Sequence, residues 1–284
     1  MRILNKYKKE DIIFIDIETA PLVESLEIDS PLFEAWSYKK RNDNLSNIEL
    51  QESYFNEAGL YAEFGKVICI SVGKVISGNK IKTVSYYGDD EEDILSRFCK
   101  DLSSKGNTVE LCGHNIKKFD IPFIVKRCII NGVDVPPKLD VSGLKPWEIT
   151  YLDTMELWGG FSSLISICVA LGIESPKDGI DGSKVGEEYY KGNLTKIVKY
   201  CEADTKAVAL VLLTFMKEDT RPLLLKLFEG YRYTKEEKKE LEELISEFSA
   251  SEKKKLKVIL DAMTSTARGK VTKVTKADIK ELLT

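Results

Sequence analysis

The sequence predicts an α/β fold in which helices cover both faces of a mixed β-sheet, with a small all-helical unit appended at the C-terminus. Two observations predict the sheet: strand-like segments come first as a hairpin, and strands then alternate with helices. A third predicts the appendage, because the chain becomes charged and amphipathic after Arg221 and Pro222. We therefore expect one domain over residues 1–219 and a helical C-terminal unit over residues 220–284.

The elements follow one another in a regular order. Ile12 to Ile17 has the apolar pattern of a buried strand, and residues 23–64 are mixed and polar, which indicates a long excursion of irregular pieces. Residues 77–80, Ser-Gly-Asn-Lys, are a hairpin signal between the next two strands. The remaining predicted strands span residues 66–76, 80–87, 108–112 and 148–153. The predicted helices of the domain span residues 89–102, 120–130, 162–171 and 194–216.

The predicted C-terminal unit differs from the rest of the chain in charge. From Arg221 onward there are 15 basic and 11 acidic residues, a net charge of +4, which leaves −8 for the first 220 residues. The lysine-rich run at residues 253–257 either contacts a phosphate backbone or forms the solvated face of a helix, and we favour the second. The unit is also a candidate for binding a protein partner. Its predicted helices begin at Thr234, Ser249 and Thr275, the first two with capping boxes.

Composition excludes several classes of protein. Hydrophobic residues make up 43% of the chain and charged residues 31%, as in soluble globular proteins. The start of the chain lacks a signal pattern, and the longest apolar run, residues 208–216, is too short to span a bilayer. We therefore expect a cytoplasmic protein without membrane association. The six cysteines form no C-x-x-C pair, so we expect buried thiols and neither a disulfide framework nor a zinc site.

The first acidic motif is Phe-Ile-Asp-Ile-Glu-Thr at residues 14–19. Alternate residues of a strand share one face, so Asp16 and Glu18 point the same way and their oxygens can reach one divalent ion. Acid-x-acid pairs also recur by chance in a chain with 46 acidic residues, as at Glu27 and Asp29. The position of the motif favours a site, because open α/β sheets bind ligands where their strands end.

The second motif is Gly-His-Asn-Ile-Lys-Lys-Phe-Asp-Ile-Pro-Phe at residues 113–123, between a predicted strand and a predicted helix. Its polar anchors are Asn115 and Asp120. An aspartate two residues before Pro122 is typical of a helix N-cap, and from this segment alone we favour that role for Asp120. For His114, the only histidine, we expect a structural hydrogen-bonding role, since one histidine among many acids is a poor transition-metal site.

The third motif is Tyr-Cys-Glu-Ala-Asp at residues 200–204, within a long predicted helix. Asp204 lies in the middle of an apolar stripe on this helix, and Tyr200 lies one turn earlier at the edge of the stripe. A carboxylate facing the core needs a cation, which is either a metal shared with Asp16 and Glu18 or a distant lysine or arginine, and we favour the metal. The stripe consists of Ile197, Cys201, Val208, Val211 and Phe215, and the opposite, solvated side of Lys199, Glu202 and Lys206.

Together the three motifs resemble, in order and spacing, the exonuclease motifs of the DnaQ-like, or DEDD, superfamily of 3′–5′ exonucleases. The tyrosine four residues before the last aspartate matches the DEDDy branch, because the histidine branch would need histidine at position 199, which is lysine. The chain most closely resembles predicted 3′–5′ exonucleases related to the proofreading domain of B-family DNA polymerases. The resemblance spans residues 12–216, includes the segments 58–71 and 171–185, and leaves out the helical tail.

The resemblance implies an RNase H-like fold and a two-metal-ion exonuclease that hydrolyses phosphodiester bonds at the 3′ end of a nucleic acid. Carried over by position, Asp16, Glu18 and Asp204 would hold the Mg²⁺ or Mn²⁺ ion that binds the attacking water. Asp16 would also bridge to a second such ion, which Asp120 would help to hold. The chemistry of the residues agrees, because hard divalent cations prefer carboxylate oxygen and two ions stabilise both the entering and the leaving oxygen. An unperturbed tyrosine has a pKa of about 10, so we assign Tyr200 to orienting the water by a hydrogen bond.

Other residues near these motifs are candidates for binding substrate. Asn115 either orients the substrate or ties down its loop, and Phe119 either stacks on a terminal base or packs in the core. Thr19, directly after Glu18, is a further substrate-binding candidate. Residues 177–184, Lys-Asp-Gly-Ile-Asp-Gly-Ser-Lys, lack the spacing of EF-hand and Walker loops, so we expect a turn near the site.

Single-stranded DNA is the favoured substrate. One rival is an RNA-trimming exoribonuclease of the same fold, because the acids do not distinguish the two sugars. The other rival is a non-catalytic nucleic-acid-binding or scaffolding module. Four intact acids argue against that module, because an unused cluster of carboxylates repels itself.

Overall fold

Five strands form a mixed sheet in the computed structural model, which describes residues 1–76, 80–173, 181–218, 243 and 253. The order across the sheet is β3-β2-β1-β4-β5. β1 pairs antiparallel with β2 and parallel with β4, while β2 pairs antiparallel with β3 and β4 pairs parallel with β5. The predicted mixed α/β fold is confirmed. The strands span Ile12–Pro21 (β1), Gly65–Val75 (β2), Ile81–Tyr87 (β3), Glu110–Gly113 (β4) and Leu152–Asp153 (β5).

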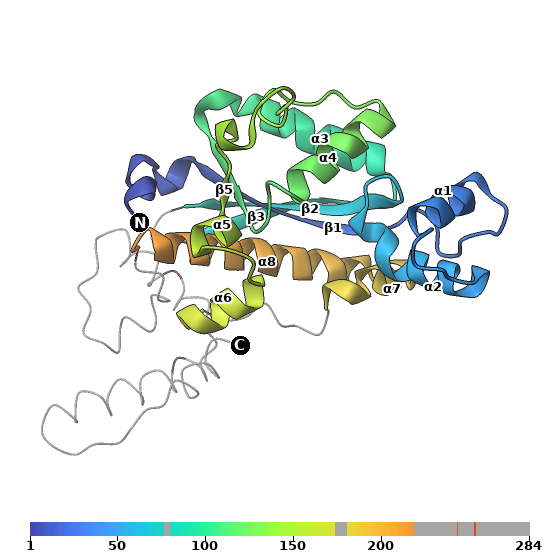
Figure 1. Ribbon diagram of the computed structural model, residues 1–284. Helices are drawn as coiled ribbons and strands as arrows, with labels where there is room; N and C mark the ends of the chain where they lie inside the picture. Colours follow the sequence, from blue (N-terminus) through green and yellow to red (C-terminus); the bar gives the residue numbers. More distant parts are fainter. Residues whose placement is uncertain (77–79, 174–180, 219–242, 244–252, 254–284) are drawn as a thin grey trace, which may run out of the picture. The chain divides into compact units, whose positions relative to one another are not determined.

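Helices cover both faces of the sheet (Figure 1). α3 and α4 pack on one face, whereas α8 runs along the other face against β1, β2 and β3 and has α6 packed on it. The helices span Pro31–Lys39 (α1), Asn47–Glu57 (α2), Glu91–Ser104 (α3), Asp120–Asn131 (α4), Thr154–Trp158 (α5), Leu164–Leu171 (α6), Val185–Tyr190 (α7) and Leu194–Phe215 (α8).

β1 is buried on both faces, and the alternation of its side chains decides which way each one points. Odd-numbered residues such as Ile15 belong to the core beneath α3 and α4, and even-numbered residues such as Phe14 belong to the core beneath α8. Asp16 and Glu18 share the parity of Phe14, so they leave the strand toward α8. The first acidic motif therefore faces the helix that contains the third.

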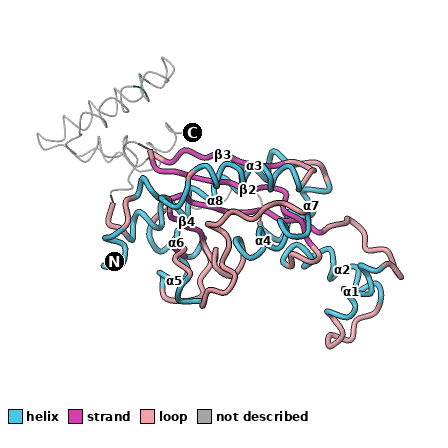
Figure 2. The backbone as a smooth tube through the Cα atoms, turned by 90° about the horizontal axis from the view of Figure 1, so that it is seen from above, coloured by secondary structure: helices cyan, strands magenta, loops and turns pink. Residues whose placement is uncertain are grey.

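Residues 23–64, expected to be irregular, instead contain α1 and α2 with a small core of their own. Ser30 caps α1 through its hydroxyl, and Ser46 begins α2 with a capping box. Each helix buries only two side chains. Neither therefore has the long, periodic apolar stripe from which the other helices were predicted. Both views show α1 and α2 at one end of the sheet, past the end of β1 (Figures 1 and 2). Their core consists of Leu26, Phe33, Trp36, Leu50, Tyr54, Ala58 and Phe64.

The strand predicted over residues 148–153 is much shorter than expected. β5 pairs with β4 through Leu152 and Asp153 alone, and residues 149–151 of the predicted strand pair with none of the described strands. α5 and α7 were not predicted, since helices of 5 and 6 residues are too short to show a period. The other predicted strands and helices of the domain begin and end within a few residues of those observed.

Several predictions concern the chain as a whole. All six cysteines are buried free thiols, as predicted. In the described part of the chain, no helix has both the length and the apolar character that crossing a membrane requires. Residues 77–79 of the predicted hairpin lie outside the described residues. So does the predicted helical unit over residues 220–284, except for Glu243 and Lys253, and the boundary near residue 219 stays a prediction.

Candidate active site

Asp16 and Glu18 lie on β1 where the sheet opens. β1 pairs with β4 only from Ile12 to Phe14, so none of the described strands continues beside that edge of β1 at Asp16. The pairing with β2 shifts register between Glu18 and Thr19, a β-bulge of the kind that redirects side chains next to functional sites. Glu18 is 8% exposed. This position, at the carboxyl end of a parallel strand pair, is where open α/β sheets bind ligands.

α8 brings Asp204 and Tyr200 to the same face of the sheet. The helix contacts β1 directly, because the thiol of Cys201 donates a hydrogen bond to the backbone carbonyl of Asp16 at 3.4 Å. Tyr200 and Asp204 lie one turn apart on this helix, near enough for the charge of Asp204 to raise the pKa of the Tyr200 hydroxyl. The predicted apolar stripe is confirmed, because all five of its members are buried: Ile197, Cys201, Val208, Val211 and Phe215.

Asp120 joins the group from α4, although not as the helix cap that we favoured from its own segment. The N-cap is Phe119, no side chain caps the helix, and Asp120 is the first helical residue. Its carboxylate is 4% exposed and lies near the backbone N–H of Ile17, an interaction that lowers its pKa against the effect of burial. The N–H of Ile17 is free for this contact because β4 has already ended. The N-cap interpretation was therefore wrong, and the acid is held against β1 instead.

The four carboxylates interact with one another. Burial, and then the charges of Asp204, Glu18 and Asp120, hold the pKa of Asp16 well above its ordinary value. Burial and the charges of Asp204, Cys69 and Asp120 likewise raise the pKa of Glu18. Burial raises the pKa of Asp120 to about 7 and that of Asp204 to about 6. The charges of acids on β1, α4 and α8 thus act on one another, and the assignment of all four to one site stays a prediction.

No cationic side chain in the described part of the chain pairs with this group. The ion pairs there include none of the four acids, which argues against the buried salt bridge considered for Asp204. Oδ2 of Asp16 is buried and has no hydrogen-bond partner. One carboxylate oxygen each of Asp16 and Glu18 and the sulfur of Cys201 lie within 4.8 Å of one another. An unpaired buried oxygen among further carboxylates fits a hard divalent cation.

Asp153, which the sequence analysis did not single out, holds the loop that precedes α4. It is 3% exposed, and its carboxylate accepts hydrogen bonds from the backbone N–H groups of Asn115 at 3.0 Å and Lys117 at 3.3 Å. Its charge also raises the pKa of Asp120. The only sequence signal for this residue is its position as an acid at the last place of a predicted strand.

His114 makes the structural hydrogen bonds that we predicted. Its Nε2 donates to the carbonyl oxygen of Ser162 at 2.9 Å, and its Nδ1 pairs with the hydroxyl of Thr154 at 2.9 Å. Burial lowers the pKa of the ring, which favours the neutral form with Nδ1 as acceptor. The ring therefore ties the end of β4 to the segment around α5.

The three predicted substrate residues lie next to the four acids in sequence, and each also has structural contacts. Thr19 donates from its hydroxyl to the carbonyl of Gly59 at 2.6 Å. Asn115 has a φ of 62°, in the left-handed region, and its carbonyl accepts from the N–H of Phe119 at 3.0 Å. Phe119 packs against the core, with its ring centroid 5.6 Å from that of Phe123. Their roles toward substrate stay predictions.

One residue of α8 lies in a different environment from the one expected. Glu202, assigned to the solvated side of the helix, is half-buried and accepts a hydrogen bond from the hydroxyl of Ser85 at 2.8 Å. The reason is that β3 also packs on α8, which a pattern confined to the helix cannot reveal. Lys199 and Lys206 are exposed, as predicted.

The turn predicted over residues 177–184 is described only from residue 181. Within that part, Gly182 lies near the acids, since a Cβ built on it would be 3.9 Å from the hydroxyl oxygen of Tyr200. This agrees with the expected turn near the site, and residues 177–180 lie outside the described residues.

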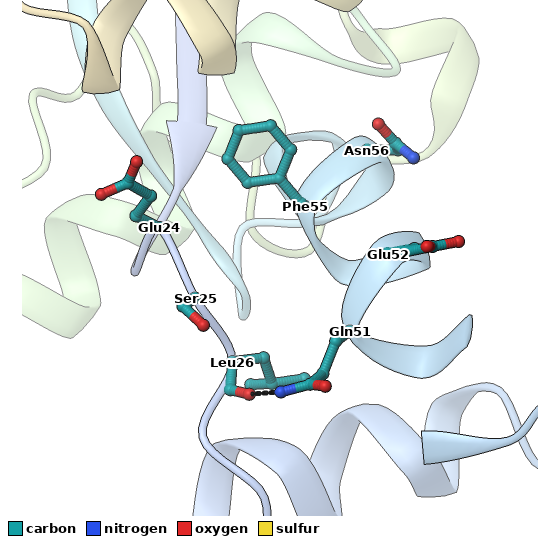
Figure 3. Close-up of a pocket in the computed structure, with 7 residues that line it drawn as sticks. All are labelled: Glu24, Ser25, Leu26, Gln51, Glu52, Phe55 and Asn56. Atoms are coloured by element: carbon teal, nitrogen blue, oxygen red, sulfur yellow. Dashed lines mark hydrogen bonds between the residues drawn. The ribbon is translucent and has the colours of Figure 1, made fainter. Parts of the chain in front are cut away.

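The pocket in Figure 3 lies apart from the acid group. It has a volume of about 450 Å³, between α2 and the segment that follows β1. Gln51 donates to the carbonyl of Leu26 at 2.6 Å on one side of it, and the ring centroid of Phe55 lies 6.2 Å from that of Tyr190. None of the pocket residues is a predicted site residue. Its lining consists of Glu24, Ser25, Leu26, Gln51, Glu52, Phe55 and Asn56.

A family model described as a predicted 3′–5′ exonuclease related to the exonuclease domain of PolB matches residues 60–261. The matched segment contains Asp120, Tyr200 and Asp204 and continues past residue 216, where we expected the resemblance to end. Asp16 and Glu18 precede it, so their place in the group rests on the structure.

Among solved structures, the chain is similar to the family B DNA polymerase from the hyperthermophilic archaeon Pyrobaculum calidifontis, with 16% sequence identity and a TM-score of 0.45. The match covers 76% of this chain and 25% of the polymerase chain, so the protein corresponds to about a quarter of that polymerase. Comparison with curated proteins finds no match.

Proposed function

The chain belongs to the family of predicted 3′–5′ exonucleases related to the exonuclease domain of PolB, and from this we propose that it is a metal-dependent hydrolase that removes nucleotides from the 3′ end of a nucleic acid. The observation that best supports catalysis is the buried, unpaired Oδ2 of Asp16 among three further acids. A structural role for such a group would require compensating donors or cations.

Mg²⁺ or Mn²⁺ suits this donor set. In our proposal Asp16, Glu18 and Asp204 hold one ion, and Asp16 and Asp120 hold a second. The bound ions would supply a nucleophile near neutral pH and stabilise the charge on the entering and leaving oxygens. Each ion would also remove the repulsion that now raises the pKa values of the acids.

Tyr200 orients the attacking water in this proposal. Burial raises its pKa well above the ordinary value whether or not an ion is bound, and in the metal-free protein the charges of Asp204, Glu18 and Asp16 raise it further. The phenol therefore stays protonated near neutral pH and acts as a hydrogen-bond donor and acceptor. A phenolate acting as general base is disfavoured for the same reason.

Single-stranded DNA is the substrate that we favour, with RNA as the alternative, because the four acids make no contact that would read the sugar. Thr19, Asn115 and Phe119 are the proposed substrate contacts. We also propose a cytoplasmic location and a protein-binding role for residues 220–284. A non-catalytic nucleic-acid-binding module is the rival function.

The test compares a 5′-labelled DNA strand with the RNA strand of the same sequence, each incubated with Mg²⁺ or Mn²⁺. We expect a ladder of products shortened from the 3′ end, which EDTA abolishes. Asp16→Asn should abolish it too, because the amide keeps the shape of the side chain and removes its charge. Glu92→Gln, an acid-to-amide change at an exposed position of α3, is the matched control and should retain the ladder.

Each outcome separates the candidate functions. A ladder from DNA alone supports the favoured substrate, and a ladder from RNA alone supports the exoribonuclease. If strands bind without any metal-dependent product, the binding module is correct and the catalytic proposal fails.

A further inference from the structure

Phe161 is the most exposed large apolar side chain in the described part of the chain, at 96%. It follows α5 and two glycines with positive φ, Gly159 at 107° and Gly160 at 147°. An isolated exposed apolar residue needs no explanation by itself. Phe161 is different because of how its backbone is held and where that backbone lies.

The backbone on both sides of Phe161 is fixed. On one side Gly159 ends α5, and its N–H donates to the carbonyl of Glu156 at 3.0 Å. On the other side the carbonyl of Ser162 accepts from Nε2 of His114 at 2.9 Å, and Ser163 then caps α6. The segment thus presents a solvent-exposed ring on an anchored backbone, so little conformational entropy would be lost when the ring is covered.

The same contacts place the segment that bears this ring between the loop before Asp120 and the helix α6. His114, which holds Ser162, immediately precedes Asn115 in the loop that leads to Asp120. At the other end of the segment, Cys168 of α6 lies near enough to Asp204 for the carboxylate to raise the pKa of its thiol. Phe161 therefore belongs to a segment that spans from the loop of one site acid to the helix of another.

The chemistry around Phe161 suits an unpaired nucleic-acid strand. Lys118, in the loop that His114 anchors, is exposed and can face phosphates. Lys117 lies in the same loop and pairs with Glu156 of α5 at 2.7 Å, which places a second ammonium group near the segment. Aromatic rings next to basic side chains are how single-strand binders hold bases and backbone together.

We propose that the ring of Phe161 stacks on an unpaired nucleobase of the substrate strand, upstream of the bond to be cut. The inference rests on the proposed function and adds a base-binding position outside the motifs that resemble the exonuclease family. Because the faces of bases in a duplex are already stacked, such a contact selects single strands over duplexes. It tolerates any base, since every base has a π-face.

The experiment measures the affinity of labelled oligodeoxynucleotides by fluorescence anisotropy in the Asp16→Asn background with Mg²⁺, in which we expect no cleavage. Adding Phe161→Ala should weaken binding between about 5-fold and about 100-fold, and Phe161→Tyr should restore it. Ile129→Ala is the control. Its side chain is 69% exposed but is aliphatic and lies near the C-terminal end of α4, nine residues after Asp120, so its removal should leave affinity unchanged.

Abasic substitutions then show whether the lost contact is a base. Bases are removed one at a time, starting from the 3′ end. At one position the loss of the base should weaken binding by the parent protein, which retains Phe161, but should not weaken binding by Phe161→Ala any further. Equal affinity of Phe161→Ala and its parent for every strand would overturn the inference and leave a protein contact as the role of this ring.

The proposed function fails separately. If the unsubstituted protein gives no ladder, catalysis is refuted whatever Phe161 does. If it gives the ladder and Phe161→Ala binds normally, only the stacking site is refuted. Unchanged melting temperature and circular dichroism of Phe161→Ala would exclude loss of folding as the cause of weaker binding.

Discussion

The surroundings of Asp120 in the folded protein differ from those that its neighbours in the sequence predict. Its pKa of about 7 exceeds the ordinary 3.8, mainly because it is buried. Between these two pH values the folded protein binds more protons than the unfolded chain. The contribution of Asp120 to the free energy of unfolding therefore falls as pH rises from 3.8 to about 7. Above about pH 7 the protein bears the full cost of burying the charged carboxylate.

We accordingly expect Asp120→Asn to stabilise the metal-free protein in a pH-dependent way. In EDTA, its melting temperature should exceed that of the unsubstituted protein by several degrees at about pH 8, and by much less at about pH 4. Differential scanning fluorimetry across this range measures the difference. Adding Mg²⁺ should reduce the difference at high pH, because the ion compensates the buried charge of Asp120. A constant difference at every pH would show that Asp120 is not the titrating group.

Tyr200→Phe removes the hydroxyl that lies one helical turn from Asp204. If the phenol orients the attacking water, kcat should fall by about 10- to 100-fold, the effect of one hydrogen bond to a charged group. Binding of Mn²⁺, measured by isothermal titration calorimetry, should change little, because Tyr200 is not a proposed ligand. Loss of Mn²⁺ affinity equal to the loss of kcat would assign Tyr200 to shaping the metal site instead.

At the residue scale, order and spacing along the chain selected the four acids and Tyr200 as candidates. Their roles stay predictions, and the structure shows that the charges of the acids act on one another. The sequence did not reveal Asp153, whose importance lies in two backbone hydrogen bonds to a loop that is distant in sequence. Nor did it reveal the partner of Glu202, which lies on another element. A contact between two elements produces no periodic pattern in the sequence of either element.

The docking of α8 on the sheet decides where Asp204 lies. At Gly73 of β2, an added Cβ would come within 2.9 Å of Cγ2 of Thr205, which is closer than real contacts allow. The absence of a side chain at this one position lets the helix approach the strand. Cys201 and Asp204 lie within one turn before Thr205 on the same helix. The close approach of the helix to β2 therefore also sets the distance from Asp204 to the acids of β1.

Gly73→Ala is therefore expected to move α8 outward, lower the free energy of unfolding by about 1–3 kcal/mol and reduce activity. Urea denaturation and the nuclease assay measure the two effects. Thr205→Ser removes the methyl group that the new Cβ would meet, so the double variant should recover much of both losses. If the double variant is no better than Gly73→Ala, the close approach is not the cause.

Among the elements, those with at least seven residues and a clear period were predicted well, and among the shorter ones only β4 was. α1 and α2 were missed because each buries only two side chains, and their core exists only once both helices meet. β5 was predicted too long because residues 149–151 have a strand-like pattern but pair with none of the described strands. Short elements are specified by their neighbours more than by their own pattern.

At the scale of the whole molecule, the start of the chain closes against the end of α8. The terminal amino group of Met1 donates to the carbonyl of Phe215 at 3.0 Å, and Lys9 pairs with Glu218 at 2.7 Å. Residues 1–75 and 81–218 form one compact unit. Both contacts and both large cores lie within this unit.

We therefore expect residues 1–218, expressed alone, to fold cooperatively and to show the same Mg²⁺-induced rise in melting temperature as the full chain. Thermal denaturation with and without the ion measures this. Activity on short strands should also be kept. If the shortened protein is insoluble or does not respond to Mg²⁺, residues after 218 are part of the folded domain and the predicted boundary near residue 219 is wrong.

Because His114 is the only histidine and lies in the loop that leads to Asp120, binding near this loop can be followed by proton NMR. The chain has one histidine, so its imidazole gives a single pair of aromatic signals that need no isotope labelling to assign. That ring is hydrogen-bonded to Ser162 and Thr154 and lies in the loop that leads to Asp120. The two imidazole signals should therefore shift when an ion or a nucleic-acid strand binds. The same titration would show whether binding changes the environment of the segment that bears Phe161.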